Sequence, residues 1–154
     1  LDESCDVIAQ HQDTAGPQQA AEERGVFSIG YNSDMSKMAP KAYMTAPVWN
    51  WGPYYVDQVK KVMAGTWKPE SYWEGMNADI VRLAPLTKNA PDGAEAKVED
   101  IKKKILAGTF NVFSGPIKDQ KGKIRVPAGA VMSDEEQLSC NWFVEGVVGT
   151  IKGK

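Results

Sequence analysis

Trp49, Asn50 and Trp51 form the segment of this sequence whose side chains are best suited to hold a small molecule. Indole rings offer wide apolar faces with a polar N–H, and an amide offers a donor and an acceptor together. This combination suits a flat heteroaromatic ligand, which needs stacking on its faces and paired hydrogen bonds on its edge, or a sugar. The alternative interpretation is that the rings belong to the core and that Asn50 caps the following helix.

A second group of polar side chains follows two predicted strands. His11 and Asp13 come after the first strand and Asp34 after the second. The functional interpretation is that His11 and Asp13 face a crevice and that Asp34 accepts hydrogen bonds from vicinal ribose hydroxyls. The alternatives are a loop histidine, an Asx-type helix cap at Asp13 and a turn residue at Asp34.

The elements that must position these side chains begin with a predicted βαβ unit. Residues 6–9 form an apolar run typical of a buried strand, residues 18–24 are typical of a helix, and residues 26–30 predict the next strand. Ligands usually bind in the crevice at the carboxyl ends of such strands. The segments that follow the two strands are residues 10–14 and 31–34.

The rest of the sequence predicts shorter elements. A helix is predicted from Pro53 to Ala64, with an apolar stripe that includes Tyr55, Val59 and Met63. The other predicted elements are a strand at 43–46, an aromatic loop at 47–52, a strand pair at 72–76 and 80–83, a helix at 94–107, an edge strand at 124–126, a capped helix at 133–138 and a strand at 141–147.

The composition excludes several classes of protein. The 154 residues are 42% hydrophobic and 25% charged, close to globular averages. A net charge of −2 lacks the basic excess of a non-specific nucleic-acid binder. No apolar run approaches the roughly 20 residues needed to cross a bilayer.

Catalytic and metal-binding motifs are missing from the sequence. His11 is the only histidine, and no nucleophile elbow, phosphate-binding glycine loop or Cys-x-x-Cys pair is present. Cys5 and Cys140 either form a disulfide or remain as two free, buried thiols. The sequence therefore predicts neither a catalytic centre nor a zinc site.

Several long and unusual segments resemble one family, in the same order along the chain. They are DVIAQHQD at 6–13, GYNSDM at 30–35, TAPVWNWGPYY at 45–55, GTW at 65–67 with YWEGM at 72–76, and residues 105–120 with NWFVEG at 141–146. The chain resembles the basic membrane protein family of ABC-transporter substrate-binding proteins, of the purine-nucleoside-binding type.

The resemblance implies an α/β fold of the type I periplasmic-binding kind, with a three-layer βαβ sheet. Residues 1–154, beginning at Leu1, are expected to be a single partial domain. It corresponds to the carboxyl-terminal half of a two-lobed protein, containing mostly that lobe, the hinge and one helix of the amino-terminal lobe. The helix from Pro53 to Ala64 would then pack on the amino-terminal lobe or on a second copy of the chain.

The resemblance also implies a function. The protein is expected to bind a purine nucleoside or base between two lobes and to dock on a membrane permease, on the periplasmic or extracellular face. Neither catalytic residues, nor a cofactor, nor a metal, nor a nucleic-acid partner is expected. The alternatives are a truncated interaction domain that oligomerises and, less favoured, a nucleoside hydrolase.

The family's ligand-facing positions are carried over residue by residue. They are Gln10, His11 and Asp13 after the first strand, Asp34 after the second, Trp49, Asn50 and Trp51 at the hinge, and Trp73 and Glu74 on a later segment.

Overall fold

Residues 1–151 are described by a computed structural model, and the chain divides into two units within helix α3 (Ala94–Leu106). The first unit is Leu1–Asp100 and the second begins at Ile101. None of the helices among the described residues is both long and apolar enough to span a membrane.

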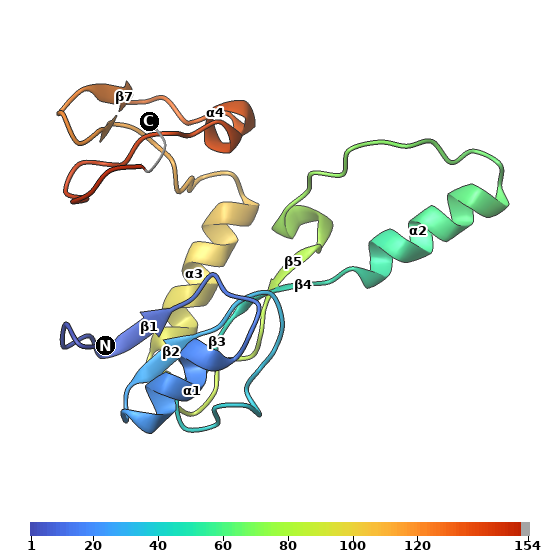
Figure 1. The fold of residues 1–154 in the computed structure, drawn as a ribbon. Helices are drawn as coiled ribbons and strands as arrows, with labels where there is room; N and C mark the ends of the chain where they lie inside the picture. Colours follow the sequence, from blue (N-terminus) through green and yellow to red (C-terminus); the bar gives the residue numbers. More distant parts are fainter. Residues whose placement is uncertain (152–154) are drawn as a thin grey trace. The chain divides into compact units, whose positions relative to one another are not determined.

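The first unit contains a parallel three-stranded sheet in the order β1-β2-β3 (Figure 1). Its strands are β1 (Val7–Ala9), β2 (Phe27–Ile29) and β3 (Tyr43–Thr45), and α1 (Gly16–Glu23) connects β1 to β2. The predicted βαβ unit is confirmed, as is the prediction of an α/β fold with a parallel sheet.

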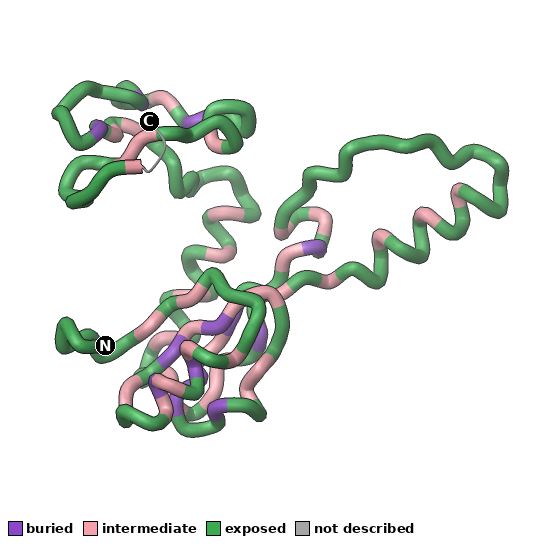
Figure 2. The backbone as a smooth tube through the Cα atoms, viewed as in Figure 1, coloured by how far each residue is buried: buried purple, intermediate pink, exposed green. Residues whose placement is uncertain are grey.

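The core of the first unit is small and lies mainly around β3. Tyr43 is fully buried and packs with Ala46 and Ala84. The position directly after β2 requires glycine. A Cβ at Gly30 would lie 2.9 Å from Tyr43 Cε2 and 3.1 Å from Gln18 Nε2. In Figure 2 most of the buried positions of this unit gather around the sheet.

The aromatic segment at 47–52, predicted to be a loop, contains a strand. β4 (Pro47–Trp49) pairs antiparallel with β5 (Val81–Leu83), and Trp49 lies opposite Val81. The expected pairing of 72–76 with 80–83 is therefore wrong. Residues 72–75 have no regular structure, and a 3₁₀ turn, η1 (Met76–Ala78), follows them.

Helix α2 (Gly52–Met63) confirms the predicted helix, with Pro53 in its first turn. Gly65 follows its end with a φ of 66°, a left-handed conformation that glycine adopts without strain. No residue of α2 is buried, and Figure 2 shows exposed and intermediate positions along its whole length.

The second unit has less regular structure. It contains β6 (Ile117–Lys118), which pairs antiparallel with β7 (Ile124–Val126), and α4 (Asp134–Leu138). The predicted capping box is confirmed because Ser133 Oγ accepts a hydrogen bond from the Glu136 N–H. The predicted strand at 141–147 is wrong, since only Val144 makes a β-bridge there, with Asp119.

Both cysteines are free and exposed. Cys5 lies before β1 and Cys140 follows α4. The structure therefore agrees with the free-thiol alternative, but the expectation that these thiols are buried is wrong.

Candidate ligand-binding site

The loop after β1 is shaped by the side chain of Gln10. Its Nε2 donates to the carbonyl oxygens of Gln12 at 2.9 Å and Thr14 at 3.1 Å. Its Oε1 is buried without a hydrogen-bond partner. Gln10 thus acts in the structure as a brace for the loop that carries His11 and Asp13.

His11 and Asp13 lie exposed on this loop, and each contacts the segment that follows β2. The His11 ring meets the Tyr31 ring edge-on, with centroids 4.3 Å apart. Asn32 Nδ2 donates to Asp13 Oδ1 at 2.7 Å. The alternative of Asp13 as a helix cap is wrong, because the N-cap of α1 is Ala15 and makes no side-chain bond.

Asp34 forms a local turn. Its Oδ1 accepts a hydrogen bond from the Ser36 backbone N–H at 2.9 Å, and this bond is the main cause that lowers the pKa of Asp34. The buried Tyr43 hydroxyl has no hydrogen-bond partner. Burial is the main cause that raises the pKa of Tyr43, and the nearby Asp34 charge raises it further. The turn alternative for Asp34 is confirmed, and its contact with a ligand stays a prediction.

The tryptophans and tyrosines around the start of α2 form one exposed aromatic cluster. Trp49 and Trp51 lie 5.8 Å apart between ring centroids, and Trp51 stacks on Tyr55 at 6.1 Å. Tyr54 continues the cluster to Tyr72, at 4.5 Å. Trp49 and Trp51 are each 42% exposed, so the alternative that these rings form the core is wrong.

Asn50 is held by the turn that precedes β5. Its Nδ2 donates to the backbone oxygen of Asp79 at 3.0 Å, and its own N–H donates to the Ile80 carbonyl at 2.8 Å. Asn50 therefore does not cap α2, whose N-cap Trp51 makes no side-chain bond. Because the amide nitrogen is engaged, the amide oxygen is the part of Asn50 available to a ligand.

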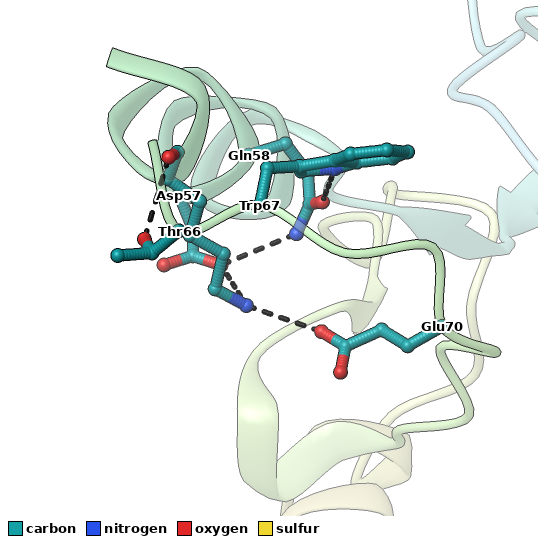
Figure 3. Close-up of polar contacts among 6 residues, drawn as sticks. Asp57, Gln58, Thr66, Trp67 and Glu70 are labelled. Atoms are coloured by element: carbon teal, nitrogen blue, oxygen red, sulfur yellow. Dashed lines mark hydrogen bonds and ion pairs between the residues drawn. The ribbon is translucent and has the colours of Figure 1, made fainter. Parts of the chain in front are cut away.

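The segment that follows α2 folds back and contacts the polar side of the helix (Figure 3). Lys61 bridges Asp57 at 2.9 Å and Glu70 at 3.1 Å. The Trp67 indole N–H donates to Gln58 Oε1 at 2.8 Å. These contacts use one side of the helix and leave its apolar stripe uncovered.

Trp73 and Glu74 lie on the exposed segment between α2 and η1. Within residues 1–151, no hydrogen bond or ring contact joins them to the other candidate residues. The structure therefore groups seven of the nine predicted positions on or beside the loops after β1, β2 and β4, and leaves these two outside that group.

Asn32 and Asp79, which hold Asp13 and Asn50, were not among the residues predicted for the site. Each has a positive φ of 58°. The turn-rich composition of GYNSDM was the available signal for Asn32, since Asn is one of the few residues other than glycine that tolerate this conformation. Across residues 1–151, His, Cys, Asp and Glu side chains form no group of three or more that could hold a metal ion.

Residues 1–114, which include the parallel sheet, the loops and the aromatic cluster, match the family model of PnrA-like ABC transporter substrate-binding proteins, called Bmp. The chain belongs to this family. Proteins of this family are substrate-binding components of transporters, and ABC substrate-binding proteins are extracytoplasmic.

Two curated relatives match nearly the whole chain. A purine-binding protein from Brucella abortus is 42% identical over 147 residues, which are 96% of this chain. A putative ABC transporter glucose-binding protein from Haloferax volcanii is 29% identical over 154 residues, 98% of this chain. The chain spans 42% and 36% of the lengths of these relatives.

Two solved structures share the fold. A transcriptional activator of the comK gene from Bacillus halodurans has a TM-score of 0.61 and 23% identity, covering 71% of this chain and 40% of that one. A solute-binding protein of an ABC transporter system from Conexibacter woesei has a TM-score of 0.55 and 19% identity, covering 72% and 38%. At these identities the likeness concerns the fold.

Proposed function

We propose that the protein carrying this chain is the extracytoplasmic binding component of an ABC importer and that it captures a purine nucleoside or a purine base. Its family is one of substrate-binding proteins, and the relative from Brucella abortus, at 42% identity, is named as purine-binding. In this proposal the transport energy comes from a partner ATPase and the chain itself catalyses no reaction.

The exposed pair of indole rings at the end of β4 is the observation that carries the proposal. Trp49 and Trp51 are each 42% exposed, and Val48 beside them bridges Asn32, which follows the carboxyl end of β2. Ligands of α/β proteins usually bind at the carboxyl ends of parallel strands. A purine ring is flat and aromatic, so stacking on an indole buries its faces while its edge remains free for hydrogen bonds. A sugar can also lie on an indole, which makes the carbohydrate class the main competitor.

The polar groups beside the rings match the remaining parts of a nucleoside. The Asn50 amide oxygen accepts hydrogen bonds, so it suits the N–H groups of a purine edge. Asp13 and Asp34 each engage one carboxylate oxygen with protein groups. In this proposal their second oxygens receive the ribose hydroxyls, and His11 lies against the ligand from the same loop.

The uncovered stripe of α2 supports a second part of the proposal. Tyr55, Val56, Val59, Val62 and Met63 are each more than half exposed, on one side of the helix. Because the chain spans 42% of the length of its purine-binding relative, we infer that an amino-terminal lobe covers this stripe in the intact protein. A second copy of the chain is the alternative cover.

Calorimetry tests the ligand class. The intact protein is titrated with adenosine, guanosine, adenine, glucose and an amino acid, and we expect binding heat with at least one purine compound and none with glucose. Trp49→Ala is expected to weaken purine binding at least about fivefold, because stacking on one aromatic ring contributes roughly 1–3 kcal/mol. Phe110→Ala, at a 40% exposed ring of the second unit, is the matched control and should bind as the wild type does. Binding of glucose or an amino acid, with no heat from any purine, would refute the assignment.

Self-association is the second candidate function, favoured by the same uncovered stripe. A chain that exposes five large apolar side chains on one helix face is expected to associate in solution. Light scattering at several concentrations measures the mass of the chain. A mass near 16.9 kDa at every concentration would contradict association of this chain with itself.

A further inference from the structure

Asn32 has a backbone conformation that few residues other than glycine adopt. Its φ is 58°, in the left-handed region that non-glycine residues adopt at a cost. Residues are held in such conformations when the surrounding contacts require it, and they concentrate at binding sites. The contacts of Asn32 therefore show which interactions depend on this left-handed backbone.

Two hydrogen bonds of Asn32 join separate parts of the candidate site. Its side-chain Nδ2 donates to Asp13 Oδ1 at 2.7 Å, and its carbonyl oxygen accepts the Trp49 N–H at 3.2 Å. An isolated parallel bridge to Val48 accompanies the second bond. One residue thus connects the loop after β1 to the strand that carries the indole pair.

The chemistry of this contact leaves Asp13 suited to bind hydroxyl groups. An amide donor orients a carboxylate but carries no charge, so it does not neutralise the carboxylate as an arginine or lysine would. Oδ1 is engaged by Asn32, and the carboxylate keeps Oδ2 as a strong acceptor. Vicinal hydroxyls are donors that such an oxygen binds well.

We propose that Asn32 is a positioning residue that holds the Asp13 carboxylate at a fixed place beside Trp49, so that Asp13 receives the hydroxyls of a ribose while the base lies on the indole rings. This inference rests on the proposed function and deepens it. It assigns discrimination between nucleoside and free base to the pair of Asn32 and Asp13, whereas affinity for the base itself resides in the aromatic cluster.

Two substitutions separate the amide from the backbone conformation. Asn32→Gly keeps the left-handed backbone without strain and removes the amide, and Asn32→Asp keeps the size while replacing the donor with an acceptor. In the intact protein, both variants are expected to weaken adenosine binding about tenfold and to leave adenine binding within about twofold of the wild type. Asn77→Gly, at an exposed residue of η1, is the control and should change neither affinity.

A double-mutant cycle identifies the partner of Asn32. If Asn32 acts through Asp13, then Asn32→Gly added to Asp13→Ala costs no further adenosine affinity. Equal weakening of adenosine and adenine by the Asn32 variants, or no weakening of either, would overturn the inference. A full additional loss in the Asp13→Ala background would overturn it as well.

A measurement without ligand keeps this inference separate from the proposed function. Asp13→Ala is expected to move the side-chain amide resonances of Asn32 in a ¹⁵N spectrum, because their hydrogen-bond acceptor is lost. If the wild type binds no purine, the proposed function fails and the ribose role of Asp13 fails with it. Amide signals that do not move would instead show that Asn32 does not hold Asp13.

Discussion

Gly30 is the most closely packed glycine of the first unit. A Cβ there would lie 2.9 Å from the Tyr43 ring and 3.2 Å from Ala46 Cβ, both in the core. Gly30→Ala is expected to lower the free energy of unfolding by about 1–3 kcal/mol, because close-packed cores do not absorb an added methyl group. Urea denaturation measures this, and Gly75→Ala, at a site with open space around the added Cβ, should cost much less. Equal stability of the two variants would contradict the packing described.

Asp119 is a buried carboxylate in the second unit. Burial raises its pKa, but hydrogen bonds from Arg125 and from the Lys121 and Lys123 backbone amides outweigh that effect, so its pKa is lowered overall. Because the folded pKa lies below the unfolded value of about 3.9, the stabilisation from Asp119 is present above about pH 4 and is lost as the pH falls through the folded pKa.

Asp119→Asn tests this pH dependence. The wild type is expected to lose stability on acidification in that window, and the variant should lose less, because it has no carboxylate to protonate there. Denaturant unfolding followed by tryptophan fluorescence at a series of acidic pH values gives the comparison. Glu74→Gln, at an exposed side chain, should follow the wild-type curve. Parallel acid curves for wild type and Asp119→Asn would show that the hydrogen bonds do not lower the pKa.

Sequence patterns predicted the residue types of the site better than their contacts. The polar residues after β1 and the indole pair were found because their types and positions after strands are informative. The bonds from Asn32 to Asp13 and from Asn50 to Asp79 were not, since each joins residues at least 19 positions apart. Only the tertiary fold brings such residues together.

At the scale of elements, periodicity and capping signals predicted the helices well and the short strands poorly. α2, α3 and α4 lie close to their predicted bounds because an apolar stripe, a glycine stop or a capping box marks each. β4 was not predicted because its residues, Pro47 and Trp49 among them, were assigned to a loop. Three residues are also too few to show the alternation of apolar and polar side chains that marks a strand. The misplaced strand at 72–76 shows that aromatic residues alone do not make a strand.

The uncovered stripe of α2 yields a prediction for that element. Val59 is 58% exposed, so Val59→Lys in this chain is expected to change the free energy of unfolding by no more than about 0.5 kcal/mol and to reduce association through the stripe. Urea denaturation and light scattering measure the two effects. Lys60→Glu, beside the stripe, is the control for charge. A loss of several kcal/mol in Val59→Lys would mean that the stripe is packed within the chain.

At the scale of the whole molecule, the resemblance of the sequence motifs predicted the family, and the match over residues 1–114 confirms it. Composition and length alone did not, because they fit any globular domain of this size. The correspondence to the carboxyl-terminal half of a two-lobed protein stays a prediction, supported by a span of 42% of the purine-binding relative. The proposed amino-terminal lobe would also cover the five large apolar side chains that α2 exposes.

Mass spectrometry of the small molecule that remains bound to the intact protein, after purification without added ligand, identifies the ligand itself. The protein is denatured, its extract is analysed, and the extract of Trp49→Ala serves as the comparison. We predict a purine nucleoside or purine base in stoichiometric amount from the wild type and a much smaller amount from the variant. A sugar or an amino acid in stoichiometric amount would contradict the proposal that the ligand is a purine nucleoside or base.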